Sequence, residues 1–166
     1  SDLIGRSGKE ELARKLYKEI RATDGVISAI DMMLHDYGPD RYSGSVNIEI
    51  DHKRSIGEVY EEIHRLQLRI KEEYHVTMVF GIYAVDEDTA AIVDIRRYIG
   101  KFVRVNEHVK SFHALYLSKE TGTLYCDLIV DYALRDWEEL RKSFVEYMKK
   151  QYPEYEISLT IETEFV

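Results

Sequence analysis

The feature that most constrains the fold is a series of predicted helices and strands that occurs twice along the chain. Apolar residues spaced by threes and fours indicate helices, and alternating apolar residues indicate strands. Ser7-Gly8-Lys9-Glu10 has the form of a capping box, which predicts the start of the first helix. The first series has a helix ending at Asp24-Gly25, strands at 26–35 and 45–51, a helix at 55–70 and a strand at 76–82. The second has a helix at 86–105, strands at 110–118 and 124–131, a helix at 137–148 and a strand at 157–161. Both series have the order αββαβ, so we expect two units of one fold.

The two series can be aligned residue by residue. Ile30 corresponds to His113, and Asn47 to Asp127, in each case about 80 positions further along the chain. We expect each unit to be an α+β sandwich in which two helices cover one face of a three-stranded sheet. The expected divisions are a segment with the first helix at 1–24, a first domain at 25–84, a linking helix at 85–108 and a second domain at 109–166.

The strand at 45–51 indicates which face of the sheet is apolar and which is polar. Val46, Ile48 and Ile50 alternate with Asn47 and Glu49. Side chains of a strand point alternately to its two faces, so the apolar set faces the helices and the polar set faces away from them. We expect the second face to be partly solvated, or packed on the other unit or on another chain.

Composition excludes several classes of protein. The chain has 31 acidic and 23 basic residues and a formal charge of -8, which disfavours a nucleic-acid partner. Its single cysteine, Cys126, permits no internal disulfide, favours a reducing compartment and is expected to be a buried core residue. No apolar run is long enough for a membrane span, and no secretory signal is present, so the fragment as given is expected to be soluble.

The segment GVISAIDMMLHDYGPDRYSGSVNIEID, residues 25–51, carries the most specific motif, His35-Asp36-Tyr37-Gly38-Pro39. It resembles the start of the cytosolic C-terminal domain of cation diffusion facilitator transporters. The upstream segment LIGRSGKEELARKLYKEI resembles that family's connection from the last membrane helix. The downstream half resembles a second small domain that some long bacterial members append.

This resemblance implies a function for the whole polypeptide. The family's members are dimeric exporters of divalent cations, such as zinc or manganese, that exchange the cation for protons in the inner (plasma) membrane. The chain would be their cytosolic regulatory part, a pair of ferredoxin-like units that forms a homodimer and continues a transmembrane part of the same polypeptide. Residues 1–24 would then connect to the membrane domain.

The same resemblance implies that the first unit has lost its metal site. The family places metal-binding residues, mostly histidines, at positions where this sequence has other residues: Ile30, Asn47, Tyr60, Val79 and Gly81. Zinc sites need imidazoles, thiolates or carboxylates that converge from several elements. We therefore expect this unit to keep the fold without the metal.

Two other sets of residues are candidates for metal binding. In the second unit, His113, Asp127 and Glu162 fall at family ligand positions and could converge on one sheet face as a site for zinc or manganese. The alternative is that His113 is a half-buried strand residue and the two acids are solvated. His35 and Asp36 could form a weak exposed metal site, contact the membrane half or simply shape the hairpin turn.

The remaining histidines, His52, His64, His75 and His108, are expected at the surface. No catalytic motif of the phosphate-loop or nucleophile-elbow type is present, so we expect no enzyme activity. The alternative function is a stand-alone regulatory module that binds a small ligand between paired sheets.

Overall fold

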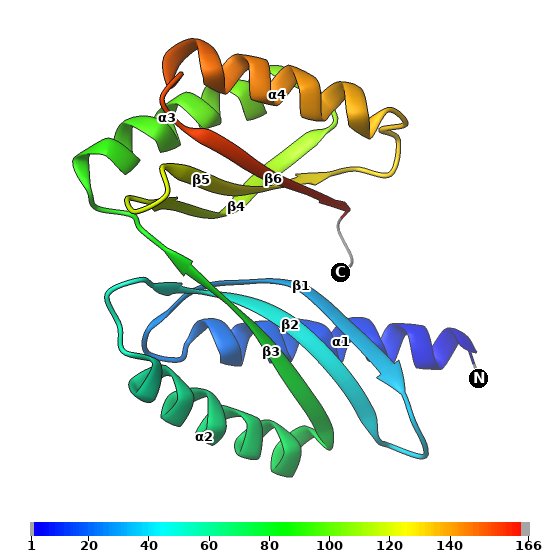
Figure 1. Ribbon diagram of the computed structural model, residues 1–166. Coiled ribbons are helices and arrows are strands. Elements are labelled where there is room, and N and C mark those ends of the chain that lie inside the picture. The colour runs from blue at the N-terminus through cyan, green and yellow to red at the C-terminus, as the bar shows by residue number, and fades with distance from the viewer. Residues whose placement is uncertain (1, 164–166) are drawn as a thin grey trace. The chain divides into compact units, whose positions relative to one another are not determined.

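The computed structural model describes residues 2–163 of the chain, and the side chains from residue 8 onward (Figure 1). The chain divides into two compact units, the first ending at Tyr83 and the second beginning at Ala84. Each unit has the element order αββαβ and one three-stranded sheet. The predicted fold class is confirmed: the protein is α+β, with two ferredoxin-like units in tandem.

The elements of the first unit are α1 (Asp2–Arg21), β1 (Val26–Asp36), β2 (Tyr42–Asp51), α2 (Ile56–Tyr74) and β3 (Val76–Val85). Strand β2 is central in the sheet order β1-β2-β3, and β1 and β2 form an antiparallel hairpin. Helix α1 already begins at Asp2, so the inference that it starts at Ser7 is wrong. The S-x-x-E pattern at 7–10 lies inside this continuous helix. The pattern is a weak sign of a helix start, because a serine followed three positions later by a glutamate also occurs within helices.

Both helices of the first unit pack on the same face of its sheet. Leu16 and Ile20 of α1, Ile48 of β2 and Ile63 and Ile70 of α2 belong to one buried core. Burying each of these side chains contributes about 1.5–3 kcal/mol to folding. The opposite face of the sheet carries no helix of this unit, and we call it the helix-free face.

The elements of the second unit are α3 (Ala90–Val105), β4 (Val109–Ser118), β5 (Thr123–Val130), α4 (Trp137–Gln151) and β6 (Glu156–Thr163). Strand β5 pairs antiparallel with β4 and parallel with β6. Helix α3 contributes Ile92, Ile95 and Ile99 to the core of this unit, so it is one of the two helices that cover the sheet. Cys126 is buried in the same core, as predicted.

The two units share an irregular feature of their first strands. The pairing of β1 with β2 shifts between Ile30 and Met33, and that of β4 with β5 shifts between His113 and Tyr116. The residue after Ile30 and the residue after His113 both have left-handed backbones, with φ of 56° at Asp31 and at Ala114. A β-bulge of this kind adds one residue to a strand without changing which side chains face the core beyond it. The alignment of the two series therefore extends to backbone geometry.

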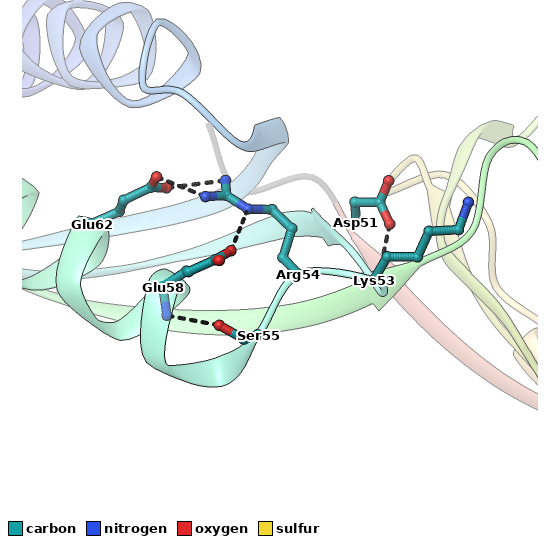
Figure 2. A network of polar contacts seen from close by, with 6 residues as sticks. All are labelled: Asp51, Lys53, Arg54, Ser55, Glu58 and Glu62. Carbon is teal, nitrogen blue, oxygen red and sulfur yellow. Dashed lines mark hydrogen bonds and ion pairs between the residues drawn. The ribbon is translucent and has the colours of Figure 1, made fainter.

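A polar network joins β2 to α2 (Figure 2). The Ser55 side chain caps α2 by accepting a hydrogen bond from the Glu58 backbone N–H. Both terminal nitrogens of Arg54 donate to the Glu62 carboxylate, at 3.1 and 2.7 Å. These bonds raise the pKa of Arg54. The guanidinium lies over Gly25, which has φ of 86° and where a Cβ would collide with it. Gly25 therefore provides both the turn after α1 and the space for Arg54.

Candidate functional site

Three of the five positions where the resemblance places metal ligands meet on the helix-free face of the first unit. Ile30 is the direct cross-strand partner of Asn47. The Asn47 side-chain amide donates a hydrogen bond of 3.4 Å to the Asp31 carboxylate. On β3, a Cβ at Gly81 would collide with the side-chain oxygen Oδ1 of Asn47. The Asn47 side-chain amide therefore occupies the space beside the glycine.

The chemistry of this group differs from that of a transition-metal site. It offers one carboxylate, from Asp31, and one amide, from Asn47, whose nitrogen already serves that carboxylate. Zinc is ordinarily bound by three or four imidazole, thiolate or carboxylate groups. The arrangement therefore links β1 to β2 through a hydrogen bond at the positions where the resemblance places metal ligands.

Tyr60 lies on α2, apart from this group, whereas Val79 is on the same strand as Gly81. Tyr60 is on α2, 66% exposed and stacked on His64 with the ring centres 5.9 Å apart. Helix α2 packs against the covered face of the sheet through Val59 and Ile63, and Asn47 is on the other face. Val79 is 62% exposed on β3, and by strand alternation it shares the helix-free face with Gly81.

The second unit places His113, Asp127 and Glu162 on its own helix-free face. His113 is directly opposite Asp127, and Glu162 on β6 is opposite Ile129, the second residue after Asp127. Asp127 is only 6% exposed. The His113 Nε2 atom lies 3.0 Å from the Ser111 hydroxyl.

Within residues 2–163, no three His, Cys, Asp or Glu side chains are gathered closely enough to hold a metal ion. The sheet register brings His113, Asp127 and Glu162 to one face, but their side chains are not gathered around a common point. Metal binding by these three residues stays a prediction.

The His35-Pro39 motif shapes the hairpin loop. The backbone N–H of Tyr37 donates to the Arg41 carbonyl at 3.0 Å, and Gly38 has φ of 120°. The Asp36 carboxylate forms an ion pair of 2.9 Å with Lys9 of α1, so the end of β1 is tied to the first helix. His35 is exposed and pairs across the hairpin with Ser43.

A surface hollow of about 280 Å³ lies beside this loop, and no local pattern in the sequence predicts it. It is lined by Tyr37 and Arg41 of the hairpin loop, Lys71 and His75 at the end of α2, and Thr77 of β3. From the sequence we expect His75 to be an ordinary surface residue, because the hollow joins two segments that are far apart in the chain, residues 37–41 and 71–77.

His108 and Asp131 form a further ionisable pair, in which the pKa of the aspartate is lowered. The His108 ring nitrogen lies 3.1 Å from both carboxylate oxygens of Asp131, and the Ala133 backbone N–H donates to the same carboxylate at 3.0 Å. The hydrogen bond to His108 is the main cause of the lowered pKa of Asp131. This pair joins the segment that precedes β4 to the segment that follows β5.

No protein-family model matches the sequence, and a search of curated proteins finds no match. Solved structures with a similar fold include variants of the C-terminal domain of MamM, a cation diffusion facilitator. One, in its nickel form, is 13% identical with a TM-score of 0.42, and the match covers 46% of this chain and 99% of that chain. Another, in its zinc form, is 15% identical with a TM-score of 0.43, covering 51% and 93% of the two chains. No helix among residues 2–163 is both long enough and apolar enough to cross a membrane.

Proposed function

We propose that this chain is the cytosolic regulatory and dimerisation part of a divalent-cation efflux transporter of the cation diffusion facilitator family. The observation that carries the proposal is the meeting of Ile30, Asn47 and Gly81 on one sheet face. These positions lie on three different strands, and the sequence motif around His35-Pro39 is what assigns all three to a metal site. The transporter would lie in the plasma membrane, with this part at its cytoplasmic face.

In this proposal the first unit regulates transport without binding a metal of its own. The Asn47 amide and the Asp31 carboxylate form a hydrogen bond where the family would hold a cation. A hydrogen bond within one chain cannot respond to the cation concentration. Association of two copies would then depend on packing, and any response to zinc or manganese would come from the second unit through His113, Asp127 and Glu162.

Calorimetry with zinc, manganese and cobalt tests the distribution of metal sites. We expect any binding of micromolar affinity to disappear in the double variant His113→Ala, Asp127→Asn. The control is Asp31→Asn, which should leave binding unchanged because the first unit is proposed to hold no metal. Micromolar binding that survives in the His113/Asp127 variant would contradict both the loss of the first site and the site in the second unit.

The transporter assignment is tested with the full-length polypeptide in proteoliposomes. We expect proton-dependent uptake of a divalent cation, at a rate that changes when residues 1–166 are deleted. Sedimentation of the isolated part should show a homodimer. Absence of cation transport by the full-length polypeptide, with the protein correctly inserted, would contradict the proposal.

A further inference from the structure

The hollow beside the hairpin loop has an unusual lining for this chain. The protein has a formal charge of -8, yet among the described residues no acidic side chain lines the hollow. Its walls carry two permanent cations, the Arg41 guanidinium and the Lys71 ammonium, together with the His75 imidazole and the hydroxyls of Tyr37 and Thr77. Every one of these groups can donate a hydrogen bond.

The two cations are available to a ligand. Within residues 2–163, neither Arg41 nor Lys71 forms an ion pair or a side-chain hydrogen bond, whereas Lys9, Arg54 and Arg69 are each paired with a carboxylate. Both side chains are exposed. An anion in the hollow would therefore meet two cations without first displacing a carboxylate of this part of the chain.

The backbone holds the walls of the hollow in place. The Tyr42 N–H donates to the His75 carbonyl at 3.1 Å, which joins the end of the hairpin loop to the end of α2. His75 caps α2 in the left-handed conformation, and its own N–H donates to the Lys71 carbonyl. The Arg41 N–H donates to the Gly38 carbonyl at 3.3 Å within the loop. The donors of the hollow thus come from segments that are fixed to one another.

We propose that this hollow is a binding site for a phosphate group. A phosphate presents several anionic oxygens, and guanidinium and ammonium groups recognise it through charge-assisted hydrogen bonds. Arg41 and Lys71 supply the charge, and His75, Tyr37 and Thr77 supply directional donors to the remaining oxygens. The phosphate can belong to a soluble phosphate compound or to the headgroup of an acidic phospholipid. This site stands independently of the transporter assignment.

The first test is a titration of the chain with inorganic phosphate, followed by nuclear magnetic resonance at constant ionic strength. We expect saturable shifts of the backbone signals of Tyr37, Arg41, His75 and Thr77. The double variant Arg41→Gln, Lys71→Gln should lose affinity by about tenfold or more, because both charge-assisted contacts are removed. The control Lys15→Gln, Arg65→Gln makes the same change in net charge at exposed positions outside the hollow and should bind as the parent does.

A second arm distinguishes the sources of the phosphate. Vesicles of phosphatidylglycerol and of phosphatidylcholine are sedimented with the parent chain and with both double variants. Retention on phosphatidylglycerol alone that requires Arg41 and Lys71 supports the lipid headgroup, and phosphate binding without retention supports a soluble phosphate compound. The proposal is overturned if chloride causes the same shifts as phosphate, or if the Arg41/Lys71 variant binds phosphate as tightly as the control. Circular dichroism melting curves establish that all variants are folded.

Discussion

Gly81 matters at the scale of single residues because it has no side chain. The Asn47 amide fills the space beside it and donates to Asp31. A glycine inside a strand ordinarily lowers the stability of the strand, because it has no side chain to pack against its neighbours. Here the missing side chain permits the close approach of Asn47, so the glycine and the amide form one packing unit across β2 and β3.

We therefore expect Gly81→Ala to destabilise the protein by about 1 kcal/mol, because the new methyl group displaces the Asn47 amide. Gly57→Ala is the control: nothing lies within 4 Å of its Cβ position, and alanine is the better helix former. Denaturant unfolding measures both variants. The cost of Gly81→Ala should shrink when Asn47→Ala is also present, and purely additive effects would contradict the proposed packing unit.

The Asp131 carboxylate gives a prediction about pH. Its pKa is lowered from 3.8, chiefly by the hydrogen bond to His108. A lowered pKa means that the contribution to stability is present above the ordinary pKa and disappears as the pH falls through the folded-state value. Asp131→Asn should therefore lower the melting temperature at pH 5, and this effect should disappear as the pH falls through the folded-state pKa. A difference in melting temperature that stays constant across this range would contradict the assignment.

At the scale of elements, the connection between β2 and α2 depends on Arg54. Its guanidinium binds Glu62 through two hydrogen bonds and lies over Gly25, so one side chain holds the start of α2 against the turn after α1. Bidentate pairs of this kind are better ordered than single surface contacts. The turn, the cap at Ser55 and the arginine thus form one joint (Figure 2).

We expect Arg54→Ala to lower the melting temperature by a few degrees, because both hydrogen bonds and the packing over Gly25 are lost. Arg97→Ala is the matched control, since Arg97 contacts only Asp94 at 3.5 Å among the described residues, and both side chains of that pair are mostly exposed. Its effect should be within about 0.5 kcal/mol of zero. Equal effects of the two substitutions would show that the joint has no special role.

The elements themselves were largely predictable, and their special contacts were not. Helix and strand types follow from local apolar spacing, which the sequence displays directly. The start of α1 was wrong because a capping pattern does not show whether the helix continues upstream of it. The bulges at Asp31 and Ala114 were not predicted, since neither residue is the glycine that usually marks a left-handed position. The Asn47–Gly81 packing and the hollow at Arg41 and Lys71 join distant segments, so no local signal announces them.

At the scale of the whole molecule, the chain contains two separate cores. One is built from α1 through β3 and the other from α3 through β6. Each core has residues from two helices and three strands, which is sufficient for a small domain to fold. The predicted positions for metal binding follow the same division, with one set in each unit.

We therefore expect the fragment from Ala84 to Val166 to fold without the first unit. Its thermal unfolding, followed by circular dichroism, should be a single cooperative transition, because α3 supplies the second helix of its core. A shorter fragment that begins at Val109 lacks α3, and it should not give a cooperative transition. A disordered longer fragment would show that the second core depends on the first unit.

The shared bulge also shows what determines a bend in a strand. Asp31 and Ala114 have nothing in common as side chains, yet both have the same backbone conformation at corresponding positions of β1 and β4. A left-handed alanine is energetically costly. The pairing of the two strands, and not the preference of the residue at the bulge, therefore imposes this conformation, and the side chain there is left open to variation.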